Sequence, residues 1–353
     1  MKFVKTITIL MSFVVMAFGN DDRVNALGGN PGFWAEDDAN VYSFPAMVNS
    51  LDMVQVTGAG STGGTATVIW GEGTTWGFSF DGSDSDDDND WLNLMWGNGT
   101  YGAIFSLGSS ATDNGLSGDA NVATSTFDMG VSFGMNQSFG ELGVMFMTGS
   151  EDNGDGNDDT NPSTVGFGLN LRRAQDVWLF NNMLVGFNNL SGTMGDASSG
   201  VMDFSCDLYT SLPTGDGVTA IFSLGLGYSS HTMDDGLGND DSEMTMSTFT
   251  LPNATLGVEA DVTDWATVRF GMNHAYVVAG SNGDATWTGT KSYNDDMELV
   301  SNFNWDFGLG FDYGSFTLDM VLENTNLFND PVRYVTGRND DALSSSATLT
   351  WKF

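Results

Sequence analysis

Carboxylate side chains recur at alternating positions of several strand-like segments, on a face shared with Gly, Ser, Thr and Asn. This alternation makes nine residues candidates for the lining of a wet interior: Asp128, Asp203, Asp207, Glu259, Asp261, Arg269, Asp306, Asp319 and Glu323. Eight of the nine are acidic, and rings of Asp and Glu favour cations in pores. The alternative is that Arg269 and Lys352, with Arg172 and Arg173 beside a predicted short turn, pair with nearby acids and only stabilise the wall.

Acidic residues also cluster in three segments rich in Asn and Gly, at 81–90, 151–159 and 234–243. Hard cations take several oxygen ligands from such backbones. The first two segments therefore supply candidate ligands for a surface Ca²⁺: Asp84, Asp86, Asp88, Asp152, Asp155 and Asp158. None of the segments has the full EF-hand spacing. The alternative is a solvated acidic surface without metal, and no other cofactor is expected.

Residues suited to catalysis are scarce. The two histidines, His231 and His274, are far apart in the sequence, and the single cysteine, Cys206, lies on an apolar strand face. The chain has no Gly-x-Ser-x-Gly, no His-Glu-x-x-His and no phosphate-binding loop. We therefore expect that the protein is not an enzyme.

The candidate lining residues lie in segments where apolar and polar side chains alternate strictly. In 127–135, 218–228 and 303–311, large apolar side chains occupy one face, while Gly, Ser, Asn and Asp occupy most of the other. A wall between lipid and a wet interior explains both faces, and a closed barrel satisfies every backbone polar group in a bilayer. The pattern predicts an all-β fold, a transmembrane antiparallel β-barrel over 51–353.

Predicted connections alternate in length. Short ones are expected near 71–74, 97–100, 136–140, 172–176, 212–216, 261–265 and 312–315, and long ones near 81–90, 108–122, 150–162, 188–199, 230–243, 279–296 and 324–342. Short periplasmic turns and long extracellular loops are typical of such barrels. Counting 51–58 and the two halves of 64–80 separately predicts 16 strands, and merging 64–80 without 51–58 leaves 14. The repeated Trp-Gly turns at Trp70 and Trp96 favour 16.

The last residues, 343–353, alternate between apolar and polar and end in Trp351, Lys352 and Phe353. This ending resembles the assembly signal of bacterial outer-membrane proteins. The resemblance implies that the barrel-assembly machinery recognises Phe353. At the other end, residues 1–19 combine a basic start, a short apolar stretch and small residues at Ala17 and Gly19, which predicts a signal peptide.

Residues 20–50 form the predicted N-terminal segment. The pattern Arg-x-x-Ala-Leu-Gly-Gly from Arg23, then Asp-Asp-Ala-Asn from Asp37, precedes the first strand. It resembles the corresponding segment of outer-membrane barrel families, including the FadL-like channels, and the resemblance implies that the segment lies in the periplasmic mouth or the lumen. Ser43, Phe44, Pro45 and Ala46 stand where FadL-like channels carry Asn-Pro-Ala, so the similarity is distant. It implies uptake of hydrophobic molecules as one alternative.

Charge narrows the expected function. A formal net charge of −36 argues against nucleic-acid binding. We expect a porin-like channel in the cell outer membrane of a Gram-negative bacterium, passing small cationic or neutral solutes through an acid-lined lumen. The alternatives are a FadL-like channel for hydrophobic molecules and a structural surface barrel with a plugged lumen. Outer-membrane lipid and lipopolysaccharide are the expected surroundings, and a homotrimer is one possible assembly.

Overall fold

The computed structural model describes residues 21–58, 63–83, 90–113, 123–152, 154, 161–234, 236, 243–282, 302–322 and 344–353. Four short helices come first: α2 (Asp21–Asn25), η2 (Pro31–Phe33), α3 (Asn40–Ser43) and η3 (Pro45–Ser50). No helix in these ranges is long and apolar enough to cross a membrane. The predicted signal peptide at 1–19 lies outside the described residues.

Sixteen strands follow. They are β1 (Met53–Thr57), β2 (Gly63–Trp70), β3 (Thr75–Ser83), β4 (Asp90–Gly97), β5 (Tyr101–Asp113), β6 (Ala123–Gln137), β7 (Gly140–Asp152), β8 (Pro162–Val177), β9 (Phe180–Met194), β10 (Ala197–Ser211), β11 (Val218–Asp234), β12 (Glu243–Thr263), β13 (Ala266–Asn282), β14 (Asn302–Tyr313), β15 (Phe316–Leu322) and β16 (Ser344–Lys352). Each strand pairs with its neighbours in the sequence.

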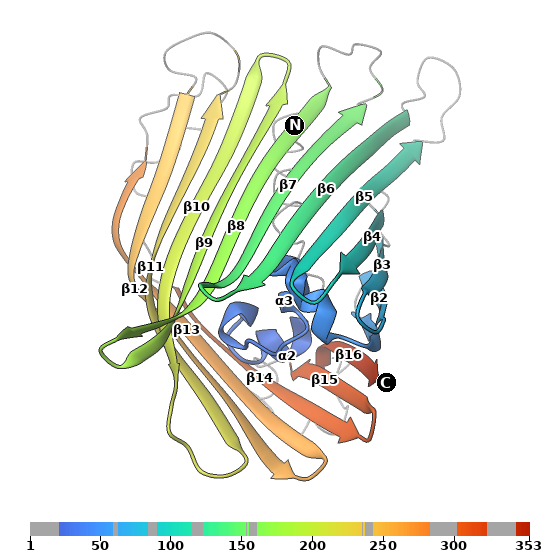
Figure 1. Cartoon of the computed structure of the whole chain (residues 1–353). Helices are drawn as coiled ribbons and strands as arrows, with labels where there is room; N and C mark the ends of the chain where they lie inside the picture. Colours follow the sequence, from blue (N-terminus) through green and yellow to red (C-terminus); the bar gives the residue numbers. More distant parts are fainter. Residues whose placement is uncertain are drawn as a thin grey trace, which may run out of the picture.

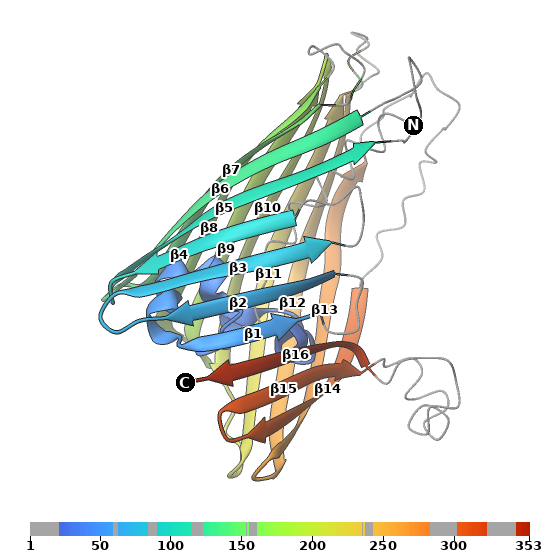
Figure 2. The ribbon, with the colours of Figure 1, turned by 90° about the vertical axis from the view of Figure 1, so that its right-hand side faces the viewer.

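The barrel closes by antiparallel pairing of β1 with β16, where Met53 faces Lys352 and Val56 faces Leu349. The predicted fold class is therefore confirmed, with 16 strands rather than 14. Figures 1 and 2 show the ring of inclined strands, in which β6 to β13 reach far beyond the short strands β1 and β15.

Two predicted connections are wrong. The expected long loop at 188–199 is a continuous hairpin, in which β9 and β10 pair as far as Met194 and Ala197 around a tight turn at Gly195. The Asn, Ser and Thr residues that suggested a loop have ladder partners and belong to the strands. The expected turn at 172–176 lies inside β8, which continues to Val177 before the turn. Arg172 is consequently a wall residue rather than a turn residue.

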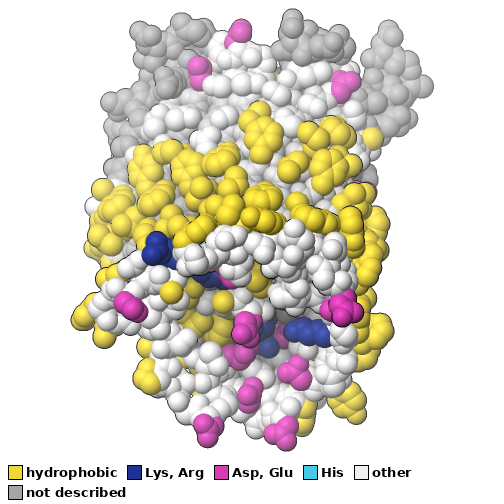
Figure 3. Space-filling view, in the orientation of Figure 1, with side chains coloured by type: hydrophobic (Ala, Val, Ile, Leu, Met, Phe, Trp, Pro, Cys, Tyr) yellow, Lys and Arg dark blue, Asp and Glu magenta, His cyan; other side chains and the backbone are white. Residues whose placement is uncertain are grey.

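The outer face of the barrel carries the large apolar side chains. Phe127, Phe146 and Phe303 are each about half exposed, and hydrophobic side chains form a broad band in the space-filling view (Figure 3). Aromatic residues gather at the end that carries the short turns: Trp70, Trp76, Tyr101, Phe139, Trp178, Trp265, Tyr313, Trp351 and Phe353 are all exposed there. An apolar band bordered by such a girdle matches a lipid-facing surface.

Candidate functional site: the plug and the lumen above it

Residues 21–50, here called the plug, fold inside the ring of strands at the short-turn end (Figures 1 and 2). The plug contributes nine of the 23 buried apolar residues in the described part of the chain. Leu27, Phe33 and Phe44 pack against Leu184 and Tyr209 of the wall in one cluster. In a second cluster, Val41 and Val48 pack against the wall residues Met53, Ile69, Met95 and Ile104. A segment of only 30 residues is therefore held by apolar packing on opposite sides of the barrel.

Inward-facing glycines form the seat of the plug. A β-carbon at Gly102 would overlap the Pro45 carbonyl oxygen, and one at Gly143 would overlap that of Ser43. At Gly134 it would lie 2.5 Å from the amide nitrogen of Ala46. Similar close approaches occur on the other side of the barrel, at Gly257, Gly271 and Gly308. Glycine is therefore required where the plug backbone lies directly on the wall.

An ion-pair network joins the plug to strands β12, β13 and β15. Arg23 of the plug bonds Glu259 at 3.0 Å and also pairs with Asp37. Arg269 bonds the same Glu259 at 2.6 Å and Asp319 at 2.5 Å. Two arginines thus pair with three carboxylates. The neighbouring negative charges of Asp37 and Glu259 raise the pKa of Arg23, although burial opposes this. The network fixes the charge state of this side of the interface.

Arg172 of β8 binds the opposite side of the plug. Its guanidinium bonds Glu141 at 2.7 Å and donates to the Gly32 carbonyl oxygen at 3.2 Å and to the Asn40 side-chain oxygen at 3.3 Å. It also lies 4.6 Å from the centre of the Phe44 ring, a cation–π distance. One wall side chain therefore connects three separate parts of the plug.

Buried carboxylates of the plug complete the interface. Asp22 accepts a 2.5 Å hydrogen bond from Thr348, and Asp38 accepts one from Gln55. Burial and the neighbouring Asp37 raise the pKa of Asp38 to about 7. Burial also raises the pKa of Asp22. Burial in the plug therefore disfavours the charged forms of these two acids.

Two cavities lie in the lumen beside the plug, with volumes of about 300 and 200 Å³. Both are lined by Asn170, Asn188 and Asp203. The wall next to them is apolar on its inner face, where Met147 and Leu190 are buried with Met145, Trp91 and Val201 packed against them. The lumen is therefore polar and acidic in one part and apolar in another.

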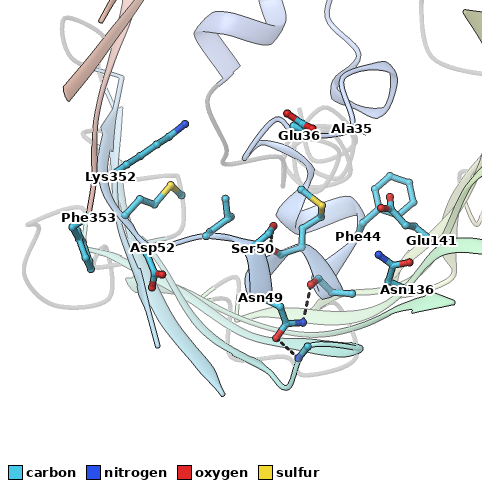
Figure 4. A pocket seen from close by; sticks show the side chains of 15 residues that line it. Ala35, Glu36, Phe44, Asn49, Ser50, Asp52, Asn136, Glu141, Lys352 and Phe353 are labelled. Carbon is cyan, nitrogen blue, oxygen red and sulfur yellow. Dashed lines mark hydrogen bonds between the residues drawn. The ribbon is translucent and has the colours of Figure 1, made fainter. Parts of the chain in front are cut away.

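A larger cavity of about 760 Å³ opens at the short-turn mouth, between the plug and the end of β16 (Figure 4). Glu36, Asp52, Lys352 and Phe353 are among its lining residues. Asn49 marks its edge and fastens the plug to the β4–β5 turn: it donates to the Tyr101 carbonyl oxygen at 3.0 Å and accepts from the Gly99 amide at 2.7 Å.

The predicted lining residues fall into separate groups. Glu259, Arg269 and Asp319 meet in the network that holds the plug. Asp203 lines both lumen cavities, and Asp261 accepts a 3.0 Å hydrogen bond from Thr267. Asp128 and Asp207 are buried in other strands, while Asp306 lies two residues before Gly308 on β14. Glu323 lies outside the described residues. The sequence therefore indicated that Glu259, Arg269 and Asp319 face inward, but it did not indicate that they bind the plug.

Of the six predicted metal ligands, only Asp152 is described, at the end of β7. Asp84, Asp86, Asp88, Asp155 and Asp158 lie outside the described residues. Within the described ranges, no group of three or more His, Cys, Asp and Glu residues could hold a metal ion.

Several important residues escaped the sequence reasoning. Asp38 and Asn40 belong to a recognised motif, but nothing in the motif showed that they face Gln55 and Arg172. The inward apolar residues Trp91 and Met147 were hidden because the apolar faces were all assigned to the outside. Their signal was available in the alternation itself, since Trp91 shares parity with the inward-facing Asn93.

No protein-family model and no curated protein matches the sequence. Among solved structures, the chain is similar to CdiB from Acinetobacter baumannii, with 11% identity over 85% of this chain and 59% of that one and a TM-score of 0.42. It is also similar to the ferric citrate transporter FecA, with 12% identity over 76% and 51% of the two chains and a TM-score of 0.41.

The toluene transporter TodX of Pseudomonas putida has 11% identity over 94% of this chain and 96% of that one, with a TM-score of 0.37. The chain thus spans little more than half of CdiB and FecA but nearly all of TodX. The protein itself is a closed sixteen-stranded antiparallel barrel with an apolar outer band and an N-terminal plug.

Proposed function

We propose that this protein is a gated channel of the Gram-negative outer membrane, which passes small cationic or neutral solutes when its plug is displaced. The outer apolar band and the aromatic girdle support the membrane location. On this proposal the short-turn end and the plug are periplasmic. Lipid and lipopolysaccharide surround the wall, and the assembly machinery recognises Phe353.

The observation that carries the proposal is the contact of the plug with the wall all round the barrel. It touches β5 to β7 at their glycines, β8 through Arg172, β9 and β10 through apolar packing, and β12, β13 and β16 through charged and polar groups. A barrel filled in this way conducts only if the plug moves. The plug is attached by side-chain packing, ion pairs and hydrogen bonds and adds no strand to the wall, so its displacement would not open the barrel.

A second candidate is a channel for hydrophobic molecules. The inward cluster around Met147 and Leu190 favours it, because a purely aqueous pore has no need for buried methionine, leucine and tryptophan on its inner face. The two candidates share the same gate. They differ in whether small ions or an apolar solute cross once the plug is displaced. The third candidate is a structural barrel that never opens. Its surface loops could bind Ca²⁺ and three copies could associate without changing this candidate.

The test is single-channel conductance of the refolded mature protein in a planar bilayer. We expect the wild type to be mostly closed and Arg172→Gln to open far more often, since losing one partner of a buried ion pair costs about 3 kcal/mol or more. The matched control is Arg173→Gln. Arg173 is the next residue, and among the described residues its guanidinium hydrogen-bonds only to the Ala174 carbonyl oxygen, at 3.5 Å.

Opening in Arg172→Gln with a cation-selective reversal potential supports the proposal. Equal behaviour of the two arginine variants, with correctly folded barrels by heat-modifiable gel mobility, contradicts it and favours the structural barrel. Flux of a neutral apolar solute into liposomes without ion conductance favours the hydrophobic channel instead.

A further inference from the structure

Three polar side chains are shared by the two lumen cavities. Asn188 of β9 pairs in register with Asp203 of β10, and Asn170 of β8 lines the same space. The plug supplies the floor through Asn30 in one cavity and Tyr42 and Ser43 in the other. The two cavities therefore border a single polar centre at the junction of plug and wall.

Asp203 is the charged member of this centre, and it is not neutralised from within the described part of the chain. No hydrogen bond or ion pair joins its carboxylate to another described residue, whereas Glu259 and Asp319 are both held by Arg269. The described arginines that face inward, Arg23, Arg172 and Arg269, all bond to other carboxylates. The partly buried carboxylate of Asp203 lines both cavities and is therefore available to a positively charged ligand that enters them.

The wall beside Asp203 is apolar. Leu190 and Val201 pair in register two residues along the same two strands, and Met145, Met147 and Trp91 pack around them. A hydrated inorganic cation gains nothing from such a wall, and an anion is repelled by the carboxylate. A neutral apolar molecule leaves the carboxylate unpaired. The complementary ligand is an organic cation, whose apolar body lies on the methionines while its ammonium group meets Asp203 and the carboxamides.

We propose that these cavities form a binding subsite for a small organic ammonium ion, with Asp203 as its charge partner. The inference rests on the proposed function, because the ligand must enter a lumen that is open to one side. Cavities of about 300 and 200 Å³ accommodate a body the size of a phenyl ring with a short amine arm. Trp91 packs against Met147 and Leu190 and so supports the apolar wall from outside the cavity lining.

The test compares three probes of similar size by titration calorimetry on the full mature chain in detergent: phenethylammonium, neutral phenethyl alcohol and anionic phenylacetate. We expect phenethylammonium to bind at least tenfold more tightly than the alcohol, and phenylacetate not to bind. Asp203→Asn should weaken phenethylammonium binding at least tenfold without changing that of the alcohol. Met147→Ala should weaken both.

The matched control is Asp306→Asn, which removes the same charge from the inner face of β14. Equal losses in Asp203→Asn and Asp306→Asn would show a general acidic field and overturn the subsite, as would equal binding of the cation and the alcohol. If Arg172→Gln opens the channel but Asp203 has no effect on the cation, the subsite is wrong and the gated channel stands. If binding depends on Asp203 but no variant conducts, the subsite stands and the channel is wrong.

Discussion

At the scale of single residues, the inward glycines have a specific role. The sequence shows that the polar faces of the strands are rich in Gly, and a wet, crowded lumen predicts that much. The structure adds that several of these glycines lie against the plug backbone, so that a methyl group there would meet main-chain atoms instead of water. Composition alone does not separate these glycines from those higher in the lumen.

Two glycines on one face of β6 test this role. A β-carbon at Gly134 would lie 2.5 Å from the Ala46 amide nitrogen, whereas one at Gly130 would meet no plug atom within 4 Å and would lie 3.4 Å from Ser106 and 3.8 Å from the Phe146 carbonyl oxygen. We expect Gly134→Ala to displace the plug and raise open-channel frequency at least tenfold, and Gly130→Ala to behave as wild type. Planar-bilayer recording of both variants decides this, and similar traces from the two would refute the seat.

At the scale of elements, the barrel and the plug differ in how far the sequence predicts them. The two faces of each strand are visible in the sequence as a period of two residues, which is local information. The barrel fold, the strand count and the inward position of Glu259 and Asp319 could therefore be predicted. The plug depends on contacts between distant residues. Arg23 bonds Glu259, 236 positions away, and Arg172 bonds Asn40, 132 positions away. No local pattern records such a contact, and the plug was recognised only by its resemblance to other N-terminal segments.

The buried acid of the plug predicts a pH dependence. Docking raises the pKa of Asp38 to about 7, chiefly through burial and then through Asp37, with Lys352 and Gln55 acting in the opposite direction. A released plug exposes Asp38, whose pKa returns to about 4. Docking is therefore strongest below pH 4, and it weakens as the pH rises toward 7. Between pH 5 and 8 the docking equilibrium should fall roughly 10- to 100-fold.

Thiol labelling measures this release directly. Ala39 is fully buried beside Asp38, so Ala39→Cys in a Cys206→Ala background should react with a maleimide faster at pH 8 than at pH 5, after correction for the thiolate fraction. Adding Asp38→Asn should remove most of the excess. An excess that is unchanged in Asp38→Asn would assign the pH dependence to another group.

At the scale of the whole molecule, the height of the wall exceeds what a bilayer needs. About 9–11 tilted residues cross a hydrocarbon core of about 30 Å, but β10, β11 and β12 have 15, 17 and 21 residues. The band of apolar side chains covers only part of this height (Figure 3). Along β10, for example, the outward residues change from Phe204 and Leu208 near the short-turn end to Ser198 and Gly200 beyond them. The barrel should therefore sit with its short-turn girdle at one membrane surface and extend well past the other.

Tryptophan depth tests this placement. Trp265 lies at a short turn, stacked on Phe311 at 6.0 Å, whereas Trp305 lies eight positions before the turn residue Tyr313, beside Phe270. Eight residues along a tilted strand rise about 20 Å, close to the bilayer centre. Lipids brominated near the glycerol should therefore quench Trp265 most, and those brominated deep in the chains should quench Trp305 most. Fluorescence differences between wild type and Trp265→Phe or Trp305→Phe isolate each residue.

The plug supplies the control for that experiment, because Trp34 is buried inside the barrel. Trp34→Phe should lower the total fluorescence but leave the intensity lost to quenching unchanged with either lipid. Equal quenching of Trp265 and Trp305 at both depths would show that the apolar band does not face a bilayer in the proposed orientation. The expected difference in depth between Trp265 and Trp305 follows from one feature of the whole chain. The aromatic residues that border the apolar band lie at the end where the plug closes the barrel. The same measurement therefore also places the gate near a membrane surface rather than at the bilayer centre.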